Sequence, residues 1–185
     1  MYYRPKYFHN YQERKDFLIK EYTPMLGEDI INRLLETEFL LAPASTKYHG
    51  NYEGGLFDHS VNVAEVLRQL TDKNDLKWEM PGTSPVVVGL LHDLCKVDQY
   101  EYNEDTDTYT YSDSSIVKGH GIKSVIYIQQ LGIELTEEEV ACVIYHMGAF
   151  TPDKEWKDYN AAINKYPNVL WTHTADMIVS QIMEV

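Results

Sequence analysis

Four histidines and two aspartates have the types and spacing expected of a divalent metal site. His92 and Asp93 are adjacent at the end of an apolar run that begins at Val86, and Lys96 follows about one helical turn later. A buried imidazole and carboxylate are costly to leave without a partner, and a divalent cation satisfies both groups. The other candidate ligands each fall in a separate helical pattern: His59, His120, His146 and Asp176. A single such histidine is more often structural, so the combination carries the prediction.

The donor set restricts the choice of metal. Imidazole and carboxylate ligands together suit Mn, Fe, Co, Ni or Zn, and Mg is also compatible. The sequence has two cysteines and no cysteine cluster, which argues against a structural zinc site and favours a catalytic one. Cys95 lies between Asp93 and Lys96, but a continuous helix would turn it about 200° away from Asp93. We therefore expect Cys95 and Cys142 to be reduced, packed thiols.

The order of these residues, with Lys96 behind the His-Asp pair, resembles the HD-domain superfamily of metal-dependent phosphohydrolases over roughly residues 40–183. Three stretches look most like the HD domain of bacterial 3′→5′ exoribonucleases: residues 54–61, 89–96 and 119–121. The resemblance implies an all-α helical fold with one or two metal ions. One ion would be held by His59, His92, Asp93 and Asp176. Asp93 would bridge to a second ion held by His120 and His146.

The chain is predicted to form one HD domain over residues 1–185, with a helical extension over about 1–42 and a metal-binding core over about 43–183. Apolar periodicity predicts helices over about 11–22, 30–41, 58–71, 85–96, 118–131, 137–147 and 168–183. Pro24 is expected to end the first helix, and Asp58 to cap the third. Thr136 and Glu139 form a capping box. Period-two alternation around residues 98–112 predicts one β-hairpin. Trp156 and Trp171 bracket a variable stretch that contains Asn160, Asn164 and Asn168.

Several polar residues near the predicted ligands are candidate substrate contacts. Asp93 and Lys96 are the proposed catalytic residues, because the Lys96 ammonium can reach the same pocket and bind a phosphate. The loop over residues 44–55 leads into His59, and in the resembling family the equivalent stretch helps form the substrate pocket. Further candidate contacts follow from these positions: Lys47, Tyr48 and His49 in the loop, and Lys118 and Lys123 on either side of His120.

Composition limits the possible partners. With 185 residues, 44% of them hydrophobic, the chain can bury a substantial core. A net charge of −13 argues against a surface for long nucleic acid, which requires clustered lysine and arginine. Tyr145 also stands where the exoribonuclease resemblance implies a second histidine beside His146. The N-terminus lacks the apolar core of a signal peptide and no stretch reaches about 18 apolar residues, so we expect a cytoplasmic protein without membrane contact.

These observations predict a metal-dependent phosphohydrolase, either a phosphomonoesterase or a phosphodiesterase. Its expected substrate is a small phosphorylated molecule such as a nucleotide or short oligonucleotide. Two alternatives remain open: an HD-type di-iron oxygenase, which the colour and oxygen consumption of iron-loaded protein would identify, and a non-catalytic nucleotide-binding module, which would bind without turnover. The sequence leaves the oligomeric state open.

Overall fold

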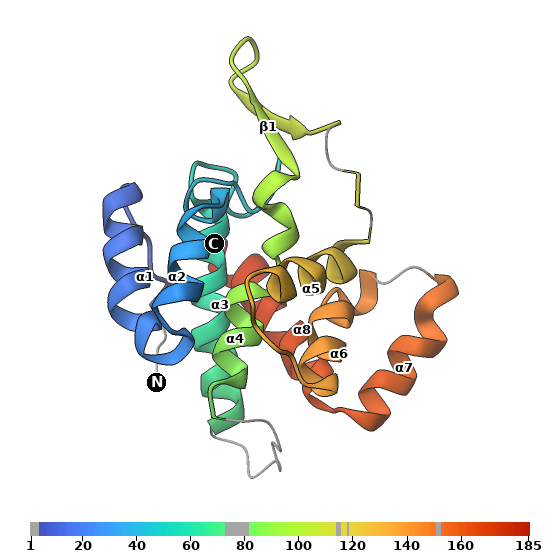
Figure 1. The fold of residues 1–185 in the computed structure, drawn as a ribbon. Coiled ribbons are helices and arrows are strands. Elements are labelled where there is room, and N and C mark those ends of the chain that lie inside the picture. The colour runs from blue at the N-terminus through green and yellow to red at the C-terminus, as the bar shows by residue number, and fades with distance from the viewer. Residues whose placement is uncertain (1–3, 73–81, 114–115, 118, 151–152) are drawn as a thin grey trace.

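A computed structural model describes residues 4–72, 82–113, 116–117, 119–150 and 153–185. In these ranges the chain is a helical bundle with one projecting two-stranded hairpin, which confirms the predicted fold class (Figure 1). The α-helices are α1 (Tyr11–Leu26), α2 (Glu28–Leu35), α3 (Gly55–Asp72), α4 (Ser84–Leu91), α5 (His120–Gln130), α6 (Glu137–Tyr145), α7 (Trp156–Lys165) and α8 (Asn168–Ile178). Shorter turns are the 3₁₀-helices η1 (Glu38–Leu40), η2 (Leu94–Asp98), η3 (Gly148–Phe150) and η4 (Asp153–Glu155), and the π-helix η5 (Val179–Met183).

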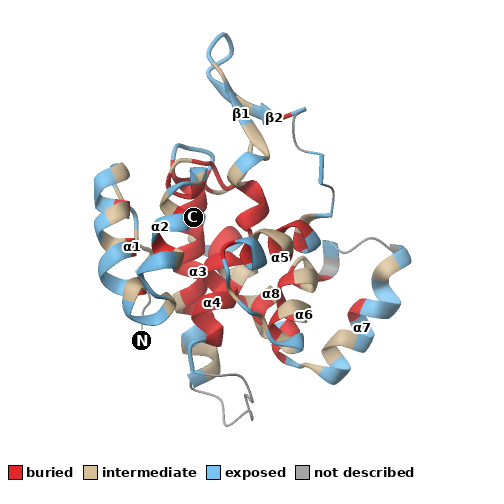
Figure 2. Cartoon of the chain, in the orientation of Figure 1, coloured by how far each residue is buried: buried red, intermediate tan, exposed pale blue. Residues whose placement is uncertain are grey.

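Helices α3 and α4 form the centre of the bundle. Residues 55–64 of α3 and every residue of α4 are buried, and both helices stand out as buried in Figure 2. Gly89 allows the two backbones to touch, because a Cβ at this position would lie 2.4 Å from the Cα of Ala64. Helices without a polar face belong in the interior, where neighbours cover them on all sides. This close approach brings the side chains of α3 near the carboxyl end of α4.

A buried ion pair attaches α1 to the start of α3. The predicted capping role of Asp58 is wrong, because α3 already begins at Gly55 and Asp58 lies inside its first turn. Its carboxylate instead accepts hydrogen bonds from Arg14 Nε at 2.9 Å and from the Tyr52 hydroxyl at 3.0 Å. Burial raises the pKa of Asp58, and the Arg14 guanidinium opposes that shift. Removing one partner of such a buried pair typically costs about 3–5 kcal/mol.

Two other helix predictions need correction. The first helix continues through Pro24 to Leu26, since a proline near the end of a helix removes only one late hydrogen bond. Gly27, with a left-handed φ of 88°, ends it instead. The expected helix over residues 30–41 is divided into α2 and η1, because the Thr37 side chain accepts the Phe39 N–H and starts a new turn.

Helix α7 was missed in the sequence. Its Asn160 and Asn164 are four residues apart and exposed on one side, whereas Tyr159 is buried. Asparagine has low helix propensity, so the stretch did not have the composition typical of a helix. The helical conformation of α7 therefore depends on the packing of its narrow apolar face against the rest of the bundle.

The predicted hairpin and capping box are both confirmed. Strands β1 (Tyr100–Asn103) and β2 (Thr108–Tyr111) pair antiparallel, and the rings of Tyr100 and Tyr111 lie 5.2 Å apart across the ladder. Such cross-strand aromatic pairs stabilise a two-stranded ribbon. The capping box at Thr136 and Glu139 starts α6 as expected. Pro81 and Gly82 predict a turn between the third and fourth helices, but Pro81 lies outside the described residues. No described helix has the length and apolar character needed to cross a bilayer.

Candidate metal centre

The structure brings all six predicted ligands to one buried place. His59 comes from α3, His120 begins α5, His146 follows α6 and Asp176 lies in α8, while His92 and Asp93 follow α4 directly. Asp93 is in the middle of the group. Its Oδ1 lies 2.6 Å from His120 Nε2 and 3.4 Å from His146 Nε2, and its Oδ2 lies 3.4 Å from His92 Nε2 and 3.8 Å from His59 Nε2. Asp176 Oδ1 adds a contact of 3.2 Å to His59 Nε2.

The His-Asp pair lies in a break between two helices rather than on one continuous helix. Helix α4 ends at Leu91, Asp93 has φ −105° and ψ 17°, and the narrower η2 begins at Leu94. The expectation that Cys95 turns away from the site is therefore wrong, because it assumed regular α-helical rotation through residue 95. Cys95 Sγ lies 3.1 Å from His120 Nδ1 instead. Burial, with the neighbouring Asp93 charge, raises the pKa of the Cys95 thiol to about 12 and keeps it protonated.

Three of the histidines are oriented by main-chain oxygens. His59 Nδ1 lies 2.9 Å from Val185 O, His92 Nδ1 lies 2.9 Å from Gly89 O, and His146 Nδ1 lies 2.6 Å from Val143 O. A carbonyl oxygen can only accept, so the proton of each neutral imidazole is on Nδ1 and the lone pair is on Nε2. These three Nε2 atoms are buried without a hydrogen-bond partner.

Unpartnered lone pairs beside two carboxylates are the arrangement that a divalent cation completes. The described residues contain three groups whose ligand atoms lie within 4.8 Å of one another: His59, His92 and Asp176; His92, Asp93 and His146; and Asp93, Cys95 and His120. The first two groups contain only imidazole and carboxylate donors. The residues present therefore fit one or two divalent ions.

The charges of the site favour ionised carboxylates. Burial alone would raise the pKa of Asp93, but the Lys96 ammonium beside it outweighs that effect and holds the pKa well below its usual range. Burial likewise opposes the charge on Asp176, but its close contact with His59 outweighs that effect and lowers the Asp176 pKa. Both side chains are thus available as anionic ligands at neutral pH.

Lys96 is beside the centre and almost fully buried. Its Nζ lies 2.6 Å from Asp93 Oδ2, and the residue is 7% exposed. Burial lowers the pKa of Lys96, but the Asp93 carboxylate outweighs that effect and the net shift is upward, so the ammonium stays charged. Lys96 lines a cavity of about 350 Å³ together with four of the six candidate ligands and with Tyr100 and Tyr111 of the hairpin. A small phosphorylated molecule has room there beside a fixed positive charge.

The remaining predicted contacts fall in different places. The His49 ring lies 4.8 Å from the His59 ring and lines the cavity, and burial lowers its pKa to about 4, so it is neutral. Tyr48 and Lys47 are exposed on the same loop. The Lys123 ammonium pairs with Asp98 rather than with the six ligands. Lys118 lies outside the described residues.

Sequence reasoning missed part of the cavity wall. Ser180 and Gln181 line the cavity from η5, four and five residues after Asp176. Helical spacing from a predicted ligand is a signal that would have found them. Tyr111 had no such signal, because it reaches the cavity only where β2 returns along β1 and pairs with Tyr100 at the base of the hairpin.

Comparison with known proteins gives two matches. The family model for the HD domain matches residues 56–179, which lie inside the predicted core; the division of that core from an N-terminal extension stays a prediction. A dihydroneopterin 2′,3′-cyclic phosphate phosphodiesterase from Methanocaldococcus jannaschii is 32% identical over 66 residues, which are 35% of this chain and 26% of that protein. No solved structure matches. The more specific likeness to exoribonucleases stays a prediction.

Proposed function

The chain belongs to the HD domain family, and from this premise we propose that it is a metal-dependent phosphohydrolase acting on a small phosphorylated molecule. One observation carries the proposal: three buried, unpartnered imidazole nitrogens lie within 3.8 Å of the Asp93 carboxylate, and the Lys96 ammonium contacts the same carboxylate at 2.6 Å. The partial similarity to a phosphodiesterase supports the same reaction class.

The six ligands divide into two sets around Asp93. His59, His92 and Asp176 would hold one ion with Asp93, and His120 and His146 would hold a second, with Asp93 shared. When bound, such ions supply Lewis acidity for the attack of water at phosphorus. Lys96 adds a fixed ammonium that offsets negative charge on a phosphoryl oxygen. The neutral His49 ring, packed on His59, closes one side of the cavity.

We propose a phosphodiester of a nucleotide-like molecule as the first substrate class to examine. The relative from Methanocaldococcus jannaschii is named for a cyclic phosphodiester of a small heterocyclic molecule, which agrees with a cavity of about 350 Å³. The net charge of −13 opposes long polyanions, whose repulsion acts over a Debye length of about 8 Å at physiological salt. Short substrates experience mainly the local charge of the centre.

A metal analysis followed by a phosphoester screen tests this function. Protein purified without chelator should contain one or two transition-metal ions per chain. With Mn²⁺ added, it should hydrolyse 2′,3′-cyclic nucleotides or nucleoside monophosphates faster than long single-stranded RNA, and EDTA should abolish turnover. Binding without turnover across the screen would indicate a binding module. Oxygen consumption by iron-loaded protein without phosphoester hydrolysis would indicate an oxygenase.

A further inference from the structure

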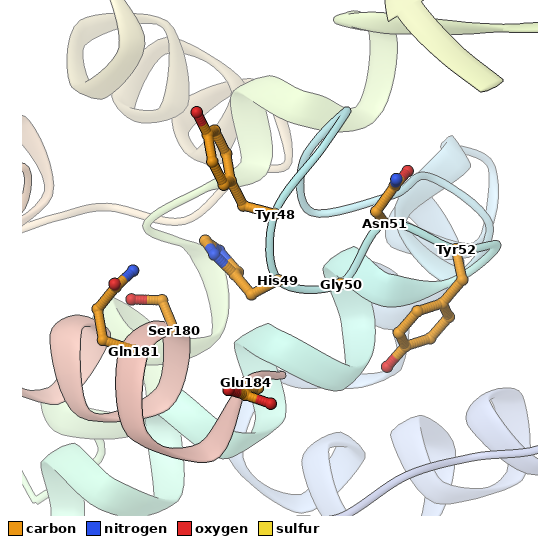
Figure 3. A pocket seen from close by; sticks show the side chains of 8 residues that line it. All are labelled: Tyr48, His49, Gly50, Asn51, Tyr52, Ser180, Gln181 and Glu184. Carbon is orange, nitrogen blue, oxygen red and sulfur yellow. The ribbon is translucent and has the colours of Figure 1, made fainter.

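A second cavity, of about 500 Å³, adjoins the metal centre. Its wall is formed by residues 48–52 of the loop before α3 and by Ser180, Gln181 and Glu184 near the end of the chain (Figure 3). His49, Ser180 and Gln181 also line the cavity that contains Asp93 and Lys96. A molecule with its phosphate at the centre can therefore extend past these three residues into the second cavity.

The two cavities differ in charge. Lys96 supplies an ammonium next to the centre, whereas Glu184 is the one charged side chain in the described wall of the second cavity. A carboxylate repels phosphate and accepts hydrogen bonds from N–H groups. The second cavity therefore suits the organic part of a substrate, and in particular a part that carries hydrogen-bond donors.

Tyr48 offers an aromatic face at this cavity. Its side chain is 79% exposed, yet its loop is held in place: the Tyr48 N–H donates to Ser45 Oγ at 2.8 Å, and that hydroxyl donates to His49 O at 2.8 Å. In Figure 3 the side chains of Tyr48 and His49 leave the loop on the side where Ser180 and Gln181 lie, whereas Tyr52 leaves it on the other side. Heterocyclic bases stack on aromatic side chains presented in this way.

We propose that the second cavity binds the heterocycle of the substrate. The ring stacks on Tyr48, and a ring N–H beside an exocyclic amino group, as in guanine, donates to the Glu184 carboxylate. This inference rests on the proposed function, because it assumes that the phosphate lies at the metal centre. It adds a preference for one heterocycle over another, which the metal ligands alone cannot provide.

Binding of three ligands to metal-loaded protein tests the heterocycle site. Guanosine 5′-monophosphate should bind about tenfold tighter than inosine 5′-monophosphate, which lacks the amino group, because one hydrogen bond to a charged acceptor is lost. Glu184→Gln should remove this difference. Tyr48→Ala should weaken both nucleotides about tenfold and leave ribose 5-phosphate unchanged.

Equal dissociation constants for the three ligands in calorimetry would overturn the heterocycle site. So would a guanosine preference that persists in Glu184→Gln. Since nucleoside monophosphates are also candidate substrates, released phosphate is measured after each titration, and metal-loaded Lys96→Met replaces the wild-type protein where turnover occurs. A failure of hydrolysis would contradict the proposed function, while these affinities still decide the inference.

A second inference concerns Cys95 and rests on a different contact. The Nδ1 atoms of His59, His92 and His146 each meet a main-chain oxygen, but that of His120 meets the Cys95 sulfur at 3.1 Å. Cys95 is fully buried, and its own N–H donates to Ser124 Oγ at 3.1 Å. The sulfur therefore has a fixed position behind the ring, and His120 Nε2 lies 2.6 Å from Asp93 Oδ1 on the other side.

We infer that Cys95 is a positioning residue for His120: when an ion replaces the proton on Nε2, the remaining ring proton lies on Nδ1, where the Cys95 sulfur would accept it and hold the ring in place. Sulfur is a weaker acceptor than a carbonyl oxygen, so this histidine is held less firmly than the other three. Partners of this kind fix the tautomer and orientation of a ligand, and their loss typically lowers metal affinity about 10–100-fold.

Metal titration of matched cysteine variants tests this role. Cys95→Val keeps the volume but removes the acceptor, and it should lower the affinity for one of two Co²⁺ ions about tenfold or more. Cys95→Ser should restore it, because the hydroxyl accepts the same proton. Cys142→Val is the control, since Cys142 is equally buried but lies beside Thr172 in α8.

Identical Co²⁺ affinities for Cys95→Val and Cys142→Val would overturn the positioning role. Circular dichroism establishes that each variant is folded, and Cys95→Ala replaces the valine variant if that one is not. Wild-type protein that binds no metal would instead contradict the proposed metal centre itself.

Discussion

Replacing Asp93 with alanine is expected to remove the bound metal and to lower phosphoester hydrolysis about 10³-fold or more, because one side chain serves both halves of the centre. Its two carboxylate oxygens lie within 3.8 Å of four imidazole nitrogens, and Oδ2 also meets Lys96 Nζ. Without this carboxylate, Lys96 and the imidazoles keep only Asp176 as a nearby anion among the six ligands. Inductively coupled plasma mass spectrometry and steady-state kinetics measure the two losses separately.

Asp98→Ala provides the control for this experiment. Asp98 is the last residue of η2, which begins directly after Asp93, and its carboxylate pairs with Lys123 and accepts from the Tyr127 hydroxyl at 2.6 Å. It should retain metal at the wild-type ratio. If Asp93→Ala also retained metal at that ratio, the ligand assignment would be wrong.

The ligands could be predicted from the sequence because their chemistry is carried by residue type. His92 and Asp93 in an apolar run, and Asp176 in the middle of a helix, are costly unless a cation binds them. Helical periodicity then placed the His92-Asp93 pair on one element and each of the other four ligands on an element of its own, and the family order related them to one another. The same periodicity predicted the all-α fold class, and one segment in which tyrosines alternate with polar residues predicted the hairpin.

The sequence did not predict features that depend on local backbone geometry or distant packing. The helix break at Asp93 turns the Cys95 side chain toward His120. Residues 91–95 contain no glycine or proline that would indicate a break. The partner of Asp58 is Arg14, which lies 44 residues away in the chain and on a helix without a candidate ligand. Contacts of this kind are determined by how helices pack, so a pattern within one segment does not contain them.

Lys96→Met is expected to lower kcat about 10²–10³-fold while metal stays bound, which would separate catalysis from metal binding. Methionine keeps the apolar stem that packs in the wall and removes the ammonium. Since Lys96 lines the cavity beside Asp93, its charge is available to a phosphoryl oxygen as negative charge develops there. The variant must be tested after metal loading, because the cation then compensates the Asp93 carboxylate that loses its lysine partner.

Lys123→Met is the matched comparison for the lysine experiment. Lys123 is also buried, at 3% exposure, and its ammonium pairs with Asp98 near the other end of η2. Both variants remove a buried ammonium from an aspartate, so a general cost of breaking such a pair would lower the melting temperature of both. If the Lys96 charge acts on the reacting phosphate, kcat should fall much further in Lys96→Met than in Lys123→Met. Equal kcat values for the two variants, with equal metal content, would mean that Lys96 stabilises the folded site rather than the reaction.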